Sequence, residues 1–266
     1  EAEFGEMMPV LMDIADQCKH LKKWLKPRKV APTAFMLGSS AEVRYEPRGR
    51  CLIIAPWNYP VTLALGPLVP AIASGNTVML KTSEMAPHFS KVLVSIVQAT
   101  FEENEVAIFE GDVSVATALL ELPFDHCFFT GAPTIGKVVM GAAAKNLTSV
   151  TLELGGKSPT IIDEHADVDM AVKTIAWGKF INSGQTCIAP DHIYVHNKVR
   201  AEFEQKLVSQ LTEWYGKDGK AGQPLAQVIN SRHADRVFHL IEDAVAKNAK
   251  VLHGGQIDRQ TNFISP

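Results

Sequence analysis

The hydrophobic positions of this chain form short apolar runs that alternate with helix-like segments. The clearest case runs from Cys51 to Leu80, thirty residues without a charged side chain. Prolines, glycines and asparagines interrupt this stretch. It therefore predicts a short strand, a turn, a kinked helix and a second strand instead of one membrane-spanning helix. A continuous apolar strand is typical of a parallel sheet covered on both faces.

The rest of the pattern alternates strand and helix, which builds a parallel sheet through right-handed crossovers. Pro133 suits the first turn of a helix, where its missing N–H costs nothing. Gly155 and Gly156 are the candidate hinge between two domains. The predicted strands are 78–81, 106–110, 126–129, 160–163 and 192–196, and the predicted helices are 88–101, 115–120, 133–144, 167–181 and 199–215.

Composition indicates an ordinary globular chain. It has 46% hydrophobic residues, 26 basic against 29 acidic side chains, and a pI near 6.3. This balance does not favour binding to nucleic acid or to an anionic membrane surface. The four cysteines lack Cys-x-x-Cys spacing, which favours free thiols in a reducing cytoplasm over disulfides. They are Cys18, Cys51, Cys127 and Cys187.

A metal site is not predicted. His192 and His196 are four residues apart, but the segment around them alternates as a strand does, so we interpret them as surface or strand histidines.

Two groups carry candidate chemistry. Cys187 follows Gly184-Gln185-Thr186, and Glu153 stands thirty-four residues before it, next to Leu154-Gly155-Gly156. A thiolate can add to a carbonyl carbon, and a carboxylate can activate the water that later releases the product. Taken alone, Cys187 could equally be a buried structural cysteine, and Glu153 a charged residue at a strand end.

Several motifs together resemble the aldehyde dehydrogenase superfamily and, within it, the class 3, fatty-aldehyde-like branch. The resemblance runs from about Pro47 to Pro266. Its motifs are Ala55-Pro56-Trp57-Asn58-Tyr59-Pro60, Ala73-Ser74-Gly75-Asn76-Thr77, Lys81-Thr82-Ser83-Glu84, Phe128-Phe129-Thr130-Gly131, 150–157 and Cys187-Ile188-Ala189-Pro190-Asp191.

The resemblance implies a Rossmann-like parallel-sheet NAD-binding domain followed by an incomplete α/β catalytic domain of the aldehyde dehydrogenase fold. We expect the first domain at 1–152, with part of a bridging segment near 31–45, and the second at 153–266. The chain would then stop near the middle of the family's catalytic domain, as a truncated form of a homodimeric or homotetrameric parent enzyme.

The resemblance also implies catalytic roles. Cys187 would be the nucleophile that forms a thiohemiacetal and then a thioester, and Glu153 the base that activates water. Asn58 would donate its side-chain amide to the oxyanion; taken alone, it is a turn-forming or helix-capping asparagine. A carboxylate at Glu153 favours release of a free acid, because relatives that transfer the acyl group to coenzyme A generally lack it.

Cofactor contacts are implied for residues that follow predicted strands. Lys81 and Glu84, alone a solvated charge pair, would bind the adenosine ribose; a carboxylate there favours NAD, with NADP open. The turn from Gly131 to Gly136 would bind the pyrophosphate, although its spacing alone fits a plain strand-to-helix turn. Ala132 and Pro133 depart from the family's polar pattern there. The full set is Trp57, Lys81, Glu84, Gly131, Ala132, Pro133, Thr134, Ile135, Gly136 and Leu154.

Three aromatic residues, Tyr59, Trp177 and Phe180, would line an apolar entrance for an aromatic or medium-to-long aliphatic aldehyde, unless they are simple core residues. Two hypotheses follow. The chain is an NAD(P)-dependent aldehyde dehydrogenase, or it is a nucleotide-binding fragment without turnover.

Overall fold

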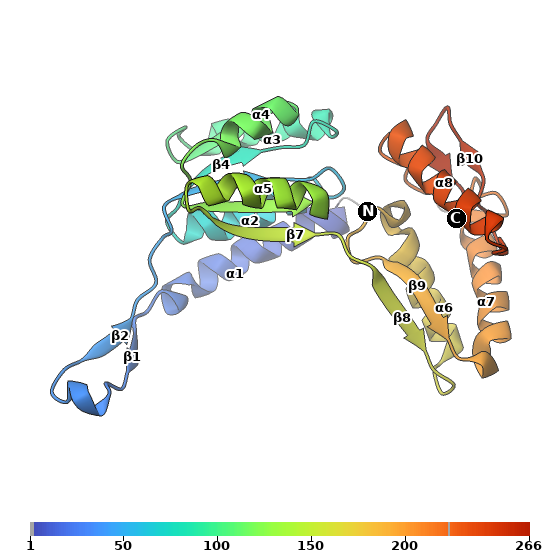
Figure 1. The fold of residues 1–266 in the computed structure, drawn as a ribbon, viewed down its shortest axis with the longest axis horizontal. Coiled ribbons are helices and arrows are strands. Elements are labelled where there is room, and N and C mark those ends of the chain that lie inside the picture. The colour runs from blue at the N-terminus through green and yellow to red at the C-terminus, as the bar shows by residue number, and fades with distance from the viewer. Residues whose placement is uncertain (1–2, 223) are drawn as a thin grey trace. The chain divides into compact units, whose positions relative to one another are not determined.

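The computed structural model describes residues 3–222 and 224–266. The chain forms two compact units, Glu1–Leu154 (unit 1) and Gly155–Pro266 (unit 2), whose elements are labelled in Figure 1. The division falls at the Gly155-Gly156 pair. Strand β7 (Ser149–Leu154) pairs with its neighbour up to Leu154, so Glu153 belongs to unit 1. The sequence-based boundary, after residue 152, had placed Glu153 in the second domain.

Unit 1 is built on a five-stranded sheet in which all strands are parallel, as the sequence predicted. Its central strand is an apolar run that is buried from Cys51 onward. Such burial on both faces explains the absence of charge in this part of the sequence. The strand order is β5 (Val106–Phe109), β4 (Thr77–Lys81), β3 (Arg50–Ile54), β6 (His126–Gly131) and β7.

Four helices cover this sheet. On one face, Leu68 and Leu93 contribute to a core cluster with alternate strand residues, and on the other Leu119 and Val139 do the same. The first face is covered by α2 (Thr62–Ala73) and α3 (Pro87–Thr100), the second by α4 (Val113–Leu120) and α5 (Pro133–Lys145). The predicted helix is present as α2, with Pro67 and Pro70 in its interior.

Two parts of unit 1 were not predicted in detail. Helix α1 (Met8–Trp24) follows a π-helical turn, η1 (Glu3–Met7), and packs on α2. Strands β1 (Arg28–Val30) and β2 (Ala41–Val43) pair antiparallel around the short helix η2 (Ala34–Met36). Figure 1 shows this hairpin projecting away from the five-stranded sheet. It lies in the segment where a bridging element was expected.

Unit 2 begins with a two-stranded parallel sheet of β8 (Ser158–Ile162) and β9 (Pro190–Val195). Its core joins Ile162, Val172, Ile175 and Phe203 from strand and helices. The other elements are α6 (Val168–Phe180), η3 (Ile181–Gly184), α7 (Asn197–Tyr215), α8 (Ser231–Ala246), β10 (Ile257–Asp258) and β11 (Phe263–Ile264). The sequence predicted β8, α6, β9 and α7 but not α8. None of the helices in the described residues is long and apolar enough to cross a membrane.

Candidate active site

Most of the predicted site residues of unit 1 lie at one edge of its sheet, which we call the carboxyl edge. Parallel strands all end at the same edge, and ligands of open α/β sheets bind there. Lys81 is the last residue of β4 and pairs in register with Ile54 of β3 and Phe109 of β5. On β6 and β7, Thr130 pairs with Glu153 and Gly131 with Leu154. The loop carrying Trp57, Asn58 and Tyr59 follows β3 at this edge.

Lys81 and Glu84 form an ion pair with an unusual balance of burial. The Lys81 side chain is 4% exposed, and its Nζ lies 2.9 Å from Glu84 Oε2, whereas the Glu84 side chain is 43% exposed. Burial alone would raise the pKa of the Glu84 carboxyl, but the Lys81 hydrogen bond and charge, together with a backbone hydrogen bond, lower it overall. The structure thus rules out a fully solvated pair. The Lys81 ammonium is buried, and the Glu84 carboxylate that pairs with it is exposed to solvent.

The turn after β6 opens helix α5 in the way the sequence predicted. Ala132 takes the N-cap position without a side-chain cap, and Pro133 is the first helical residue. The N-terminal end of the helix dipole is therefore left for an external anion. Gly136 lets this end pack closely on β7, because a Cβ there would come within 2.9 Å of Leu154 Cδ2.

Thr130 supplies a signal that the sequence interpretation missed, although it lies in the quoted motif. Among the described residues, its Oγ1 is the one buried side-chain oxygen or nitrogen without a hydrogen-bond partner. Burying a hydroxyl without a partner costs about 1–3 kcal/mol, so such groups usually await a ligand or water. This orphaned oxygen, beside Glu153 in register, fits a polar ligand at the carboxyl edge.

Asn58 does not occupy the N-cap position of the helix that follows it. That position belongs to Val61, and the N–H groups of Val61 and Thr62 donate to Glu6 Oε2 at 2.7 and 3.4 Å. A carboxylate from η1 therefore binds the first N–H groups of this helix.

Cys187 lies in unit 2, on a turn between η3 and β9, and is exposed. Exposure excludes the buried structural cysteine that was the alternative. Three consecutive residues before it adopt left-handed backbone conformations: Asn182 (φ 49°), Ser183 (φ 51°) and Gly184 (φ 75°). For residues with a side chain this conformation costs about 1–2 kcal/mol each, so the turn must be stabilised by other contacts.

Gln185 provides those contacts, and no sequence pattern indicated them. Its Nε2 donates to the carbonyls of Asn182 and Gln227, both at 3.1 Å, and its Oε1 accepts from Ile229 N at 2.9 Å. Ser183 Oγ donates to the Ala226 carbonyl. A segment some forty residues downstream thereby fixes the turn that presents Cys187.

Charged residues surround the start of β9. Asp191 Oδ1 accepts from Lys157 Nζ at 3.2 Å, and its Oδ2 lies 3.3 Å from His192 Nδ1. Burial opposes ionisation of Asp191, but these partners outweigh it and lower the pKa of the carboxyl. Burial lowers the pKa of the Lys179 ammonium, and the repulsion of Lys157 adds to this while Asp191 opposes it.

The remaining predicted residues of unit 2 occupy different surroundings. Trp177 is 62% exposed on α6, whereas Phe180 packs in a core cluster with its ring centroid 5.9 Å from that of Tyr215. His192 lies in β9, and His196 takes the N-cap position of α7. No group of three or more potential metal ligands occurs among the described residues.

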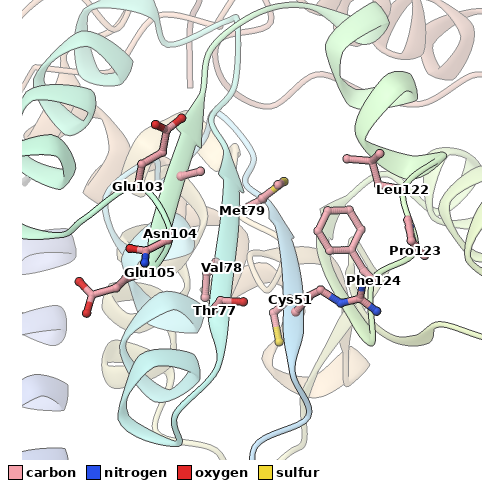
Figure 2. Close-up of a pocket in the computed structure, with 12 residues that line it drawn as sticks. Cys51, Thr77, Val78, Met79, Glu103, Asn104, Glu105, Leu122, Pro123 and Phe124 are labelled. Atoms are coloured by element: carbon pink, nitrogen blue, oxygen red, sulfur yellow. The ribbon is translucent and has the colours of Figure 1, made fainter.

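A cavity of about 280 Å³ lies at the opposite, amino edge of the sheet in unit 1 (Figure 2). Figure 2 shows Leu122, Pro123 and Phe124 on one side and 103–105 on the other, with strand residues between them. None of the predicted site residues lines it. A second, larger cavity of about 510 Å³ lies beside α1, and none of the predicted site residues lines it either. These two cavities therefore do not coincide with the candidate chemistry.

Comparison with known proteins identifies relatives of this arrangement. The family model described as "Aldehyde dehydrogenase family" matches residues 1–266. The "Aldehyde dehydrogenase, dimeric NADP-preferring" of Rattus norvegicus is 41% identical over 99% of this chain and 57% of its own length. "Aldehyde dehydrogenase family 3 member A2" of Pongo abelii is 38% identical over 98% of this chain and 53% of its length.

A solved structure shows the same fold. The substrate-bound state of Staphylococcus aureus AldH superposes with a TM-score of 0.93 and is 38% identical, covering 100% of this chain and 57% of the other. The chain thus spans between half and two thirds of the length of these relatives.

Proposed function

The chain belongs to the aldehyde dehydrogenase family, and on that premise we propose that it takes part in the NAD(P)-dependent oxidation of an aldehyde to a carboxylic acid. One observation carries the proposal. The carboxyl edge of a parallel sheet brings together a buried lysine paired with an exposed glutamate, an uncapped helix N-terminus and a buried hydroxyl without a partner. These groups fit the ribose, the pyrophosphate and a further polar part of a dinucleotide.

The residues present fit the cofactor, and each has a role in holding it. Lys81 and Glu84 would bind the adenosine ribose, the backbone from Gly131 to Gly136 the pyrophosphate, and Trp57 and Leu154 would flank it. The exposed Glu84 carboxylate favours NAD, with NADP as the second choice. Bound NAD(P) would supply the hydride acceptor for the oxidation.

Three residues of this chain would carry out the remaining chemistry. The Cys187 thiolate would add to the aldehyde carbon, forming a C–S bond, while the Asn58 amide donates to the carbonyl oxygen as it gains charge. After oxidation, Glu153 would take a proton from water, which attacks the thioester carbon and releases the acid and the thiol. Cys187 is suited to this role because its turn leaves the thiol exposed.

The substrate class is an aromatic or medium-to-long aliphatic aldehyde. Trp177 supports this choice because its indole is largely exposed on α6, the helix that leads into the Cys187 turn. Tyr59, partly buried in the loop after β3, and Phe180 would add apolar surface. A large exposed aromatic side chain favours contact with an apolar ligand over a small polar aldehyde.

We also infer a cytoplasmic homodimer or homotetramer. The four free cysteines favour a reducing compartment, and the name of the rat relative describes that protein as dimeric.

The test follows NADH formation at 340 nm from benzaldehyde and from hexanal, beside a fluorescence titration with NADH. Cys187→Ser should lower oxidation about a thousandfold or more, because a hydroxyl is a poor nucleophile at neutral pH, and should leave NADH affinity unchanged. Cys18→Ser removes another exposed thiol and serves as the matched control. Oxidation that survives in Cys187→Ser would remove this residue from the mechanism.

Glu153→Gln separates the two half-reactions. A burst of NADH should survive while steady turnover falls about a hundredfold, and an acyl adduct on Cys187 should become visible by mass spectrometry. Normal steady turnover would mean that the base lies elsewhere. Dinucleotide binding without any NADH formation by the wild-type chain would favour the nucleotide-binding alternative.

A further inference from the structure

We propose that Asp112 is a third charged residue at the ribose-binding position and that its carboxylate selects NAD against NADP. The inference rests on the proposed function, since it concerns the position where Lys81 and Glu84 would bind ribose. It adds a specificity-determining residue to that site.

The register of two neighbouring strands brings Asp112 and Glu84 to the same edge of the sheet. Lys81 and Phe109 pair across β4 and β5, and the chain continues past both in the same direction. Glu84 follows Lys81 by three residues, and Asp112 follows Phe109 by three. The two strand ends are tied together, because Thr82 N donates to the Phe109 carbonyl at 3.1 Å. The two carboxylates therefore leave the same edge of the sheet at matching positions.

Gly111 shapes the turn that presents Asp112. Its φ of +129° is strained for any residue that carries a side chain. A Cβ there would also come within 2.5 Å of Val115 Cγ2. The chain can therefore turn at once from β5 into α4, with Asp112 as the N-cap residue. Asp112 Oδ1 accepts from Ser114 N at 2.9 Å and from Ser114 Oγ at 2.6 Å, which fixes the carboxylate.

Asp112 is charged and interacts with both partners. The Ser114 hydrogen bonds, with a smaller contribution from Lys81, lower the pKa of the Asp112 carboxyl. The negative charge of Asp112 in turn acts to raise the pKa of Glu84, against the effect of Lys81. Two carboxylates thus interact with the single cation of Lys81, which leaves one excess negative charge among these three residues. A ribose diol can accept that environment, whereas a 2′-phosphate brings further negative charge into it.

A purely structural role for Asp112 as a helix cap can be separated from this one. Asparagine caps helices about as well as aspartate, so Asp112→Asn keeps the hydrogen bonds to Ser114 and removes only the charge. Glu84→Gln is the positive control. Glu103→Gln, at the amino edge of the same sheet, is the matched control for removing a carboxylate.

The experiment titrates NADH and NADPH into the full chain and its three variants and follows their fluorescence. Asp112→Asn should raise the ratio of NADPH affinity to NADH affinity by about threefold or more at about 0.05 M salt. The rise should be smaller at about 0.5 M salt, where charges are screened. Its melting temperature should stay that of the wild type. Glu84→Gln should shift the ratio in the same direction, and Glu103→Gln should leave it unchanged.

An unchanged NADPH-to-NADH ratio in Asp112→Asn, with both dinucleotides still bound, would overturn this inference and leave the proposed function standing. An equal shift in Glu103→Gln would also overturn it, because the effect would then come from net charge. Failure of the wild-type chain to bind either dinucleotide would overturn the proposed function and this inference together.

Discussion

The two edges of the sheet in unit 1 satisfy their polar groups in opposite ways. At the amino edge, polar side chains bind one another and the backbone. At the carboxyl edge, Thr130 Oγ1 has no partner among the described residues, and the first turn of α5 has no side-chain cap. Polar groups left unsatisfied inside a fold cost stability, so their presence marks the edge built for a ligand.

The network at the amino edge is nearly self-contained. Asp125 Oδ2 accepts from Arg50 N at 2.7 Å, and a Cβ on Gly49 would come within 2.4 Å of that oxygen. His126 Nδ1 and Arg48 Nη1 both reach Ser149 Oγ, at 2.8 and 2.9 Å. This pairing holds β3, β6 and β7 together. The cavity in Figure 2 lies at the same edge, and of the residues in this network only Arg50 lines it.

The contrast teaches that volume and chemistry are separate signals. A well-formed pocket is a reasonable first hypothesis for a binding site. Here the cavity in Figure 2 lies at the amino edge, and the candidate chemistry lies at the carboxyl edge, where Thr130 Oγ1 has no partner among the described residues. The following substitutions test whether the two edges differ in the way proposed.

The largest effect is expected from Lys81→Met. This change keeps the apolar stem but removes the buried ammonium, and NADH affinity should fall roughly tenfold to a hundredfold, since a hydrogen bond to a charged group contributes about 1.5–3 kcal/mol. Arg50→Met removes a cation from the amino edge and should leave NADH affinity unchanged. Fluorescence titration measures both. Equal losses in the two variants would erase the distinction between the edges.

Gly136→Val should lower the free energy of unfolding by about 1–2 kcal/mol, because the new side chain overlaps Leu154 between α5 and β7. NADH affinity should fall with it as the N-terminus of α5 moves. Gly141 lies on the same helix with no neighbouring atom within 4 Å of an added Cβ, so Gly141→Val should change stability by less than about 0.5 kcal/mol. Urea unfolding measures the free energy of unfolding of both variants. Equal losses in the two variants would show that the close packing at Gly136 is unimportant.

The smallest effect is expected at the amino edge, from His126. Ser149 Oγ donates to the Asp125 carbonyl, so His126 Nδ1 carries the proton and Nε2 accepts from Thr151 Oγ1 at 3.1 Å. Burial, and then the charge of Arg48, lower the pKa of His126 in the folded chain. Its contribution to stability is therefore complete above the ordinary histidine pKa and is lost as pH falls through the lowered value.

His126→Gln should remove this part of the pH dependence. The melting-temperature difference between wild type and variant should shrink by a few degrees at most as pH falls from about 7.5 to about 5. The pKa of His233 is also lowered by burial, but His233 is present in both proteins, so its contribution to the pH dependence cancels in the difference. A difference that grows on acidification would mean that His126 is stabilised in its charged form.

Much of unit 1 could be predicted from the sequence because its strands are buried on both faces and therefore apolar along their length. The region from Cys51 to Leu80 is the clearest example, and the structure has the predicted strand, helix and strand there. Helix α8 carried signals that went unused: Asn230 caps it by accepting from His233 N at 2.9 Å. Helix α1 buries only Val10, so its sequence shows little of the partner helix on which it packs.

The candidate site was less predictable wherever it depends on residues far apart in the chain. The Cys187 turn relies on Gln185 and the segment 226–229, and the start of α2 relies on Glu6, fifty-five residues before Val61. No local pattern encodes such contacts. Thr130 and Asp112 were missed for a related reason: their importance comes from the strand register, which pairs Thr130 with Glu153 and brings Asp112 to the same edge as Glu84.

Hydrogen–deuterium exchange of the full chain with and without NADH tests the central claim most directly, because it reports both edges of the sheet in one measurement. Bound NADH should slow exchange of backbone amides at 55–60, 82–84 and 130–136, which follow β3, β4 and β6 at the carboxyl edge. Amides at 103–105 and 122–125, around the cavity at the amino edge, should exchange as before. Protection confined to the amino edge, or equal at both, would contradict the assignment of dinucleotide binding to the carboxyl edge.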